Sequence, residues 1–415
     1  MSSPSSPTPD DRRHAESDVF NQPRMRAYRL ERIRAQLRAE DCAGIVLSNP
    51  INVRYATDSV RSTIFNLHTP HRYAFVATDG PVVLFDYKHV ANRPDHYGDI
   101  PEIVDEVRPA KSWTFFGTGS RQEEKAELWA DELADLLRAH GGGNTRLAFD
   151  RLDPIGNAAI CARQLTVANG QKIMELARAI KSGDEIAGMK IALAVAEAGM
   201  AQMQDHLETG ITENQLWSHL HKENIARGGE WIETRLLASG QRTNPWSQGS
   251  SDRIIRAGDL VAFDTDMVGP NGFLADISRT FFCGPGRPTD TQRHLYTLAH
   301  EQIHHDMALL KPGLSFREYS DRSWAIPDEF LHNRYACILH GAGIVDEWPK
   351  IPHPLDWEAI GYDGVFEENM VVCCESYIGR ENGREGVKLE EQVLIGPDGP
   401  ILLSQYPFEE ALLDA

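Results

Sequence analysis

The chain contains few cysteines for its length, and no two of them have the C-x-x-C spacing. The six cysteines are Cys42, Cys161, Cys283, Cys337, Cys373 and Cys374. Disulfide-rich secreted domains carry more cysteines, and thiolate zinc sites carry them in closely spaced pairs. The pattern therefore excludes both classes and predicts a cytoplasmic protein.

Basic residues are also in deficit. The 42 lysines and arginines stand against 61 aspartates and glutamates, which gives a net charge of -19. A surface of this charge repels phosphate backbones and anionic membranes. We therefore expect neither nucleic acid nor a membrane surface as a partner.

Long apolar runs are absent as well. No stretch approaches the roughly 18 apolar residues of a membrane helix. The Ser/Pro-rich start, MSSPSSPTPDDRRHAESD, lacks the apolar segment of a signal sequence. We expect residues 1–20 to form a disordered arm. Apolar residues make up 41% of the chain and charged residues 25%, which is typical of a globular protein.

Two domains are expected, because 415 residues exceed one ordinary core. In the first, 21–178, apolar spacing predicts helices at about 25–40 and 124–140. Strands are expected at AGIVLS and RLAFD, with a hairpin around Asp79-Gly80-Pro81. Alternating helices and strands indicate an α/β domain.

The second domain, 179–415, is predicted to open at Ser182, which forms a capping box with Glu185 ahead of a long apolar-faced helix. Further helices are expected at 212–226, 291–310 and 315–330. Strands are expected at 233–238, 260–267, 275–282, 371–378 and 387–396. The pattern predicts an α+β domain with mostly antiparallel strands.

Carboxylates gather in the segment LVAFDTDMVGPNGFLADISRTF. Asp264 and Asp266 lie two apart, so on one strand they would face the same side, and Asp276 opens the next β-rich run. A hairpin would bring the three together, where a divalent cation would offset their repulsion. The other interpretation of Asp266 and Asp276 is a solvated turn.

Three later residues favour a metal. His340 lies in the glycine-rich segment LHGAGIVDEWP, which we expect to form a loop. Glu375 and Glu390 lie in the apolar runs MVVCCESYI and VKLEEQVLIG. A glutamate in a buried strand is costly unless it is paired or bound to metal. Carboxylates with one imidazole suit a two-metal centre. Taken singly, Glu375 could be a salt-bridged core acid and His340 a loop histidine.

A competing motif is His300-Glu301-Gln302-Ile303-His304, which matches the H-E-x-x-H pattern of zinc proteases. It lies in a predicted helix with an apolar stripe, so His300 and His304 can simply occupy the solvated face. No third ligand follows it in the sequence, and we expect no zinc site here.

Five of these residues resemble, in type and order, the metal ligands of the pita-bread metallopeptidase family, which includes methionine aminopeptidase, prolidase and creatinase. The five are Asp264, Asp276, His340, Glu375 and Glu390. GDLVAFDTD, ADISRTF and HGAG resemble its signature phrases. The resemblance implies an α+β fold, with a creatinase-like α/β N-terminal domain followed by a pita-bread C-terminal domain.

Two departures argue against peptide hydrolysis. The peptidases carry a second histidine after HGIG-like text, whereas this chain has HGAGIVDEWP with Asp346 near that place. They also carry a histidine upstream of the first ligand strand, whereas the segment here offers Trp246 and Gln248.

The departures resemble the DddP-type dimethylsulfoniopropionate lyases, which release dimethyl sulfide and acrylate. This resemblance lies in three segments, RGGEWIETRLLASGQRTNPW, YACILHGAGIVDEWP and KLEEQVLIG. It implies that Asp266 is a sixth metal ligand, Asp346 the catalytic base and Tyr335 a substrate-pocket residue. Phe65 stands where such lyases tend to have tryptophan, which leaves the substrate less defined than the fold.

A β-elimination of this kind requires a carboxylate base near the substrate Cα and a site for the sulfonium cation. Aromatic faces provide such a site, and the candidates are Tyr335, Trp246, Phe65 and Trp348. Ordinary packing is the other explanation for both tryptophans. We expect two divalent or transition metal ions, iron first, with manganese, zinc or cobalt as alternatives.

Two alternatives stay open. One is a hydrolase of the same fold that acts on Xaa-Pro dipeptides or another small C–N substrate. The other is a binding protein that has lost catalysis. The resemblance also implies a homodimer, in which residues 60–72 of a partner help to close the site on a small zwitterionic substrate.

Overall fold

The structure is a computed structural model that describes residues 20–94 and 100–413. The described residues divide into two units, one of residues 21–178 and one of residues 179–413 together with Phe20. Apart from Phe20, the arm expected at 1–20 lies outside the described residues.

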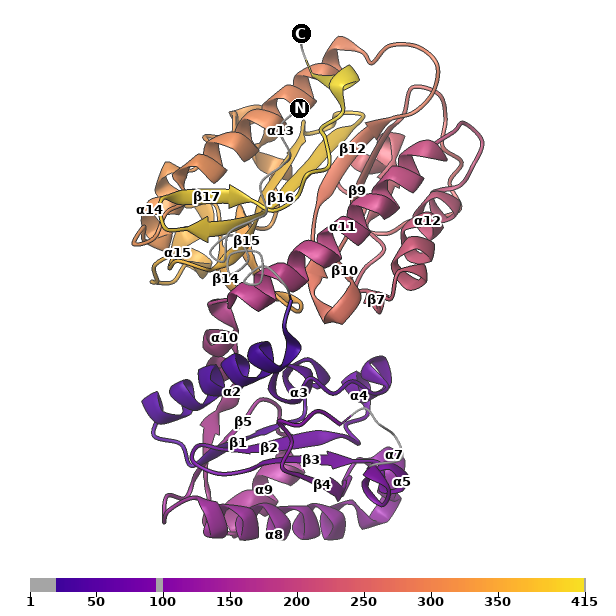
Figure 1. Ribbon diagram of the computed structural model, residues 1–415. Helices are drawn as coiled ribbons and strands as arrows, with labels where there is room; N and C mark the ends of the chain where they lie inside the picture. The colour runs from indigo at the N-terminus through magenta and orange to yellow at the C-terminus, as the bar shows by residue number, and fades with distance from the viewer. Residues whose placement is uncertain (1–19, 95–99, 414–415) are drawn as a thin grey trace, which may run out of the picture. The chain divides into compact units, whose positions relative to one another are not determined.

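A six-stranded mixed sheet forms the centre of the unit 21–178, in the order β4-β3-β2-β1-β5-β6. In Figure 1, α2 and α3 cover one face of it and α8 and α9 the other. The strands are β1 (Gly44–Leu47), β2 (Tyr73–Ala77), β3 (Val82–Asp86), β4 (Glu106–Pro109), β5 (Arg146–Phe149) and β6 (Thr166–Asn169). The helices are α2 (Gln22–Ala39), α3 (Pro50–Thr57), α4 (Thr63–His68), α5 (Lys88–Ala91), α7 (Phe115–Thr118), α8 (Gln122–His140), α9 (Pro154–Ala162) and α10 (Gly170–Ala179).

The predictions for this unit are confirmed where the pattern was strong. The helix expected at 25–40 is α2, and β2 and β3 pair antiparallel as the predicted hairpin. Strands β1 and β5 pair in parallel. Trp113 and Trp129, with ring centroids 4.0 Å apart, lie in the core between the sheet and α8.

The second unit is built on three antiparallel sheets, ordered β11-β10-β7, β12-β9-β8 and β14-β13-β15-β16-β17. The strands are β7 (Trp231–Ile232), β8 (Leu237–Ser239), β9 (Leu260–Asp264), β10 (Met267–Val268), β11 (Leu274–Ala275), β12 (Ser278–Phe282), β13 (Leu339–Ala342), β14 (Asp346–Ile351), β15 (Val371–Gly379), β16 (Gly386–Gly396) and β17 (Gly399–Leu402). The helices are α11 (Gly183–Asp205), α12 (Glu213–Ala226), α13 (Asp290–Leu309), α14 (Phe316–Arg322) and α15 (Trp357–Ile360).

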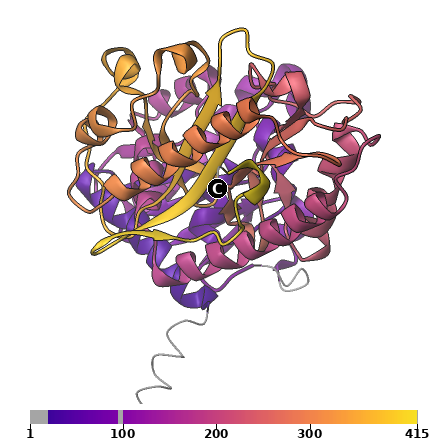
Figure 2. The same cartoon turned by 90° about the horizontal axis from the view of Figure 1, so that it is seen from above.

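Helices cover this unit on both sides. Figure 2 shows α13 in orange and α11 and α12 in magenta on opposite sides of the yellow β16. Strands β12 and β16 lie side by side, joined through the Thr280 hydroxyl, which donates to the Lys388 carbonyl and accepts from the Lys388 amide. Two of the sheets are thereby joined at this point.

Contrary to the expectation from the sequence, one stretch does approach a membrane span. The helix α11 has the length and apolar composition of such a span, but more than half of its apolar stretch is buried in the structure. Its predicted capping box is present, with Ser182 and Glu185 bonding reciprocally. Gly188 packs so closely on Phe273 that a Cβ there would lie 2.2 Å from the ring. The helix therefore serves as a core helix of this unit.

Several predictions for this unit were wrong in detail. The strands expected at 260–267 and 275–282 are each divided, the first into β9 and β10 and the second into β11 and β12, because the two halves pair in different sheets. The strand expected at 233–238 is not one strand, because β7 ends at Ile232 and pairs with β10, whereas β8 begins at Leu237 and pairs with β9 in another sheet. The helix expected at 315–330 ends at Arg322, because the Trp324 amide donates to Asp306 Oδ1 instead of continuing the helix. The glycine-rich segment 339–346, expected as a loop, contains β13 and the start of β14.

Asp306 is a buried carboxylate on α13. Its Oδ1 accepts from the Trp324 amide at 2.6 Å and lies 3.1 Å from His305 Nδ1, while Oδ2 has no hydrogen-bond partner among the described residues. The titratable groups that face it are His305, Tyr319 and Cys374. Burial raises the pKa of Asp306 to about 6.

We expect Asp306→Asn to stabilise the fold by about 1–3 kcal/mol at neutral pH, because the amide removes a charge that burial disfavours. The folded pKa is raised above the unfolded one, so the cost of the carboxylate is fully present above about pH 6 and disappears below about pH 4. Denaturant unfolding at several pH values measures this. Glu301→Gln, exposed on the same helix, is the control. An equal gain at acid pH would contradict the prediction.

Candidate metal centre

Six buried side chains meet in the second unit, each from a different strand or strand end. Asp264 ends β9, Asp266 and Asp276 lie just outside β10 and β11, His340 lies on β13, Glu375 on β15 and Glu390 on β16. Each is at most 8% exposed. The structure therefore brings together all six of the predicted metal-ligating residues.

Strand pairing fixes three of these residues. Glu375 and Glu390 are direct partners across the β15–β16 ladder, and His340 pairs with Cys373 on β13 and β15. A Cβ on Gly341 would lie 2.5 Å from the Trp348 carbonyl oxygen. Glycine thus allows β14 to approach closely at the bulge beside His340, which is why a glycine-rich segment is a strand here.

Asp266 reaches the site by a different route from the one its spacing suggested. Strand β9 ends at Asp264, and Asp266 has a positive φ of 36°. The Thr265 hydroxyl donates to the Ala275 carbonyl, and the Asp266 amide lies 3.3 Å from Asp276 Oδ1. The chain turns here, so strand alternation was the wrong reason for placing the two aspartates together. Both Asp266 and Asp276 are buried, which rules out the solvated turn.

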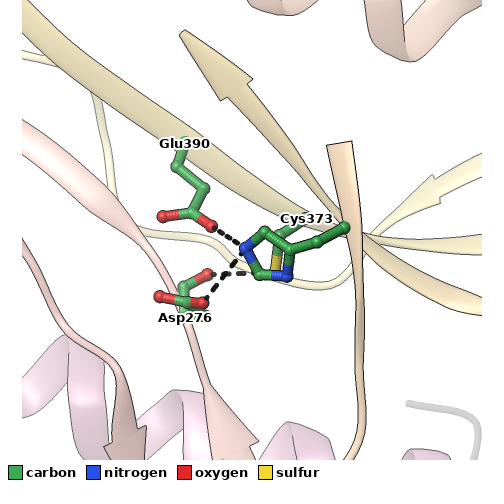
Figure 3. A group of neighbouring side chains, drawn as sticks. Asp276, Cys373 and Glu390 are labelled. Carbon is green, nitrogen blue, oxygen red and sulfur yellow. Dashed lines mark hydrogen bonds and ion pairs between the residues drawn. The ribbon is translucent and has the colours of Figure 1, made fainter. Parts of the chain in front are cut away.

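The imidazole of His340 lies among the carboxylates. Its Nε2 is 3.3 Å from Glu375 Oε1, 3.5 Å from Glu390 Oε1 and 3.7 Å from Asp276 Oδ2. Figure 3 shows the side chains of Asp276, Cys373 and Glu390 converging on this point from separate segments of the chain. The Cys373 thiol lies 3.9 Å from the Asp276 carbonyl oxygen.

The spacing of these atoms suits metal binding. Among the described residues, three groups have ligand atoms within 4.8 Å of one another: Asp276, His340, Cys373 and Glu390; Asp264, Asp266 and Asp276; and Asp264, Glu375 and Glu390. Asp264 Oδ1 and Glu390 Oε1 are buried without a hydrogen-bond partner among the described residues. Such unsatisfied anionic oxygens fit a cation as the missing partner.

The pKa values reflect the burial of these carboxylates and the repulsion between them. Burial and the charges of Asp264 and Asp346 raise the pKa of Asp266 to about 8. Burial and neighbouring carboxylates raise the pKa values of Asp276 and Glu390 well above their usual range. Burial alone would raise the pKa of Asp264, but the ammonium of Lys388 and hydrogen bonds outweigh it and lower the value to about 2. Asp266, Asp276 and Glu390 therefore hold protons more tightly than isolated carboxyl groups, and a bound metal would displace them.

Asp346 lies at the edge of the cluster. It begins β14, and its Oδ1 is 3.7 Å from His340 Nδ1 while its side chain is 62% exposed. Reduced hydration raises the pKa of Asp346, and the charge of His340 partly opposes this. The carboxylate is thus close to the cluster and open to a small molecule.

Two of the predicted aromatic residues lie beside the site. The Tyr335 ring lies 4.7 Å from the Lys388 ammonium, and its pKa is raised by burial and by the charge of Glu375. Trp246 packs on Tyr377, which lies two residues beyond Glu375 on β15 and so faces the same side. Trp246 Nε1 is buried without a hydrogen-bond partner among the described residues.

The other two aromatic residues have different surroundings. Trp348 packs edge-on against Phe316, with ring centroids 5.2 Å apart, beside a hydrophobic core cluster. Packing therefore accounts for Trp348. Phe65 lies on α4 in the unit 21–178, where its ring contacts His68, His71 and Phe116.

Sequence reasoning missed Lys388 and Cys373. Lys388 is fully buried, and its Nζ lies 2.5 Å from Glu375 Oε2. A usable signal was present, because Cys373 precedes Glu375 by two residues and Lys388 precedes Glu390 by two. On a strand, residues two apart face the same side.

The H-E-x-x-H motif forms no metal group with the described residues. His300 and His304 lie on α13 with ring centroids 4.0 Å apart, and both contact Phe408.

We expect the double variant His300→Asn with His304→Asn to bind as much metal as the unaltered chain. Asp276→Asn should lower the amount of bound metal at least tenfold, because only this change removes a carboxylate from the cluster. Elemental analysis of the purified variants measures both. Loss of metal from the histidine variant would contradict this assignment.

Comparison with known proteins covers nearly the whole chain. Residues 187–397 match the model of metallopeptidase family M24, and residues 29–184 match the creatinase/prolidase N-terminal domain. The dimethylsulfoniopropionate lyase DddP of Roseovarius nubinhibens is 38% identical over 94% of this chain and 88% of its own length. The Xaa-Pro dipeptidase of Pyrococcus furiosus is 28% identical over 54% of this chain and 62% of its own length.

Solved structures show the same fold. The Xaa-Pro dipeptidase from Bacillus anthracis superimposes with a TM-score of 0.72 at 20% identity, covering 92% of this chain and 98% of that one. The prolidase from Pyrococcus furiosus gives a TM-score of 0.68 at 20% identity, covering 90% and 99%.

Proposed function

The chain belongs to metallopeptidase family M24, and from that premise we propose that it is a metal-dependent dimethylsulfoniopropionate lyase. One observation carries the proposal. The chain is 38% identical to a dimethylsulfoniopropionate lyase over 94% of its length, and Asp346 stands beside His340 where the resemblance to the peptidases leads us to expect a histidine. An iron centre is the first candidate, with manganese, zinc or cobalt as alternatives.

Asp264, Asp266, Asp276, His340, Glu375 and Glu390 would hold two metal ions. Their five carboxylates and one imidazole form an oxygen-rich donor set, which suits such ions. Bound metal would supply Lewis-acid stabilisation of the negative charge that develops on the substrate carboxylate during elimination. The thiol of Cys373 borders this set but is not among the six proposed ligands.

Asp346 is the proposed base. Its carboxylate takes the proton from the substrate Cα, the C–H electron pair forms the double bond of acrylate, and the C–S bond breaks with its electrons on sulfur, which leaves as dimethyl sulfide. The exposure of Asp346 and its 3.7 Å separation from His340 Nδ1 support this role. A base buried like Asp276 could not reach the substrate.

The sulfonium group would lie against aromatic faces. Tyr335 and Trp246 are the better supported candidates, because each contacts a residue on the same face as a proposed ligand. Trp348 and Phe65 stay weaker candidates, since the first has a packing explanation and the second lies in the other unit.

Headspace detection of dimethyl sulfide tests the reaction directly. Metal-replete protein given dimethylsulfoniopropionate should release dimethyl sulfide and acrylate in equal amounts. No sulfide from such a sample would refute the substrate. Proline released from Xaa-Pro dipeptides would instead favour the hydrolase alternative.

We expect Asp346→Asn to reduce turnover by about 10²–10⁴-fold, because it removes the proton acceptor and keeps the shape of the side chain. Bound metal should be unchanged, since Asp346 is not a ligand in this proposal. Asp398→Asn, an exposed acid beyond β16, is the control. Loss of metal together with activity would assign Asp346 to the centre.

A homodimer is supported by an exposed apolar patch on α4 and α7, here named the α4–α7 patch. Ile64 is 56% exposed, Phe115 70% and Phe116 76%. Such side chains are uncommon on the free surface of a monomer when they lie together.

The six free cysteines are consistent with our expectation of a cytoplasmic location.

Replacing Ile64 and Phe116 by serine should convert a dimer to monomers, because it removes two apolar contacts from the α4–α7 patch. Sedimentation velocity measures the change. Leu128→Ser, a 44% exposed leucine on α8, is the matched control and should stay dimeric. An unaltered dimer in the double variant would exclude the patch as the interface.

A further inference from the structure

We propose that Lys388 is a positioning residue that holds one oxygen of each neighbouring carboxylate, so that the opposite oxygen faces the metal. The inference rests on the metal centre proposed above. It concerns the second oxygens of Asp264, Glu375 and Glu390, which the assignment of ligands leaves unexplained.

The two oxygens of Glu375 have different neighbours. Oε2 accepts a hydrogen bond from Lys388 Nζ at 2.5 Å, while Oε1 lies 3.3 Å from His340 Nε2. The two oxygens of Glu390 also have different neighbours. Its Oε2 lies 3.4 Å from Lys388 Nζ and accepts from the Ser278 hydroxyl at 2.9 Å, and its Oε1 lies 3.5 Å from His340 Nε2.

Asp264 follows the same rule. Its Oδ2 lies 3.3 Å from Lys388 Nζ, whereas Oδ1 is buried without a hydrogen-bond partner among the described residues. Glu390 Oε1 is likewise buried without a hydrogen-bond partner among the described residues. The oxygens that face Lys388 are therefore satisfied, and the oxygens that face away from it are left for a cation.

Lys388 is itself held firmly in place. It lies on β16, where its backbone amide and carbonyl both bond the Thr280 hydroxyl. Its Nζ donates to the Ser278 hydroxyl at 2.7 Å and lies 4.7 Å from the centre of the Tyr335 ring. A fully buried ammonium with this many partners has one orientation, which is what a positioning group requires.

Two effects of Lys388 on metal binding have opposite signs. Its positive charge repels a metal cation, so its removal would tighten metal binding if charge alone mattered. Its hydrogen bonds orient the ligands, so its removal would weaken metal binding if orientation dominates. The proposal is that orientation dominates, and the sign of the change in affinity decides between them.

The test is a titration of metal-free protein with Co²⁺, followed by the visible absorption of the bound ion. We expect Lys388→Met to bind Co²⁺ about 10–100-fold more weakly than the unaltered chain, as is typical when a partner of a metal ligand is removed. The cobalt absorption should also weaken, because a freed second oxygen raises the coordination number. A change in fold stability alone would move neither the shape nor the intensity of this spectrum.

A matched control lies on the same strand. Glu391 faces the opposite side of β16 and forms a buried ion pair with Arg279 at 2.6 Å. Glu391→Gln should disturb the fold to a similar degree and leave Co²⁺ affinity and spectrum unchanged. Ser278→Ala, which removes only a hydroxyl between Lys388 and Glu390, should weaken binding by a smaller factor and serves if Lys388→Met does not fold.

Each outcome is decisive. Weaker Co²⁺ binding with an altered spectrum in Lys388→Met or Ser278→Ala supports the positioning role. Equal or tighter binding overturns it and makes Lys388 a counter-charge only. If the unaltered chain binds no Co²⁺, the metal centre itself is refuted, which separates that failure from failure of this inference.

Discussion

The arrangement of the second unit depends on one electrostatic constraint, the burial of five carboxylates in contact with one another. Water cannot compensate these charges, since Asp264, Asp276, Glu375 and Glu390 are each at most 3% exposed. Buried like charges are tolerated only beside a compensating cation or when they take up protons. The antiparallel strands and the helices that cover them hold the carboxylates together against this repulsion.

Compensation comes from inside and from outside the chain. Lys388 provides one positive charge in contact with three carboxylates, and in our proposal bound metal provides the rest. Asp346 differs from the proposed ligands in being exposed at the edge of the cluster. A group in that place can exchange protons with a substrate, and this separates the proposed base from the residues proposed to bind metal.

The sequence predicted residue types and strand patterns well, and predicted less of the local geometry. Strands β15 and β16 were expected almost to the residue, because a long apolar run is a strong signal for a buried strand. The position of Asp266 was not predicted correctly. A turn with positive φ, held by the Thr265 side chain, produces no periodic pattern in the sequence. The glycines after His340 indicated a loop, whereas close strand packing requires them.

The same contrast applies to the residues that sequence reasoning missed. Lys388 and Cys373 were identifiable from two-residue spacing, but a lysine is normally read as a solvated residue. Its burial follows from the register of β16 against β12 and β15, which is a long-range property. The packing of Trp348 on Phe316 also depends on distant segments meeting.

The most direct test of the account is a crystal structure of metal-loaded protein with anomalous scattering recorded at the absorption edge of the bound metal. We expect two anomalous peaks within about 2.0–2.3 Å of oxygens and nitrogen of the six clustered side chains. Peaks elsewhere, for instance between His300 and His304, or no peak in protein that releases dimethyl sulfide, would contradict the account.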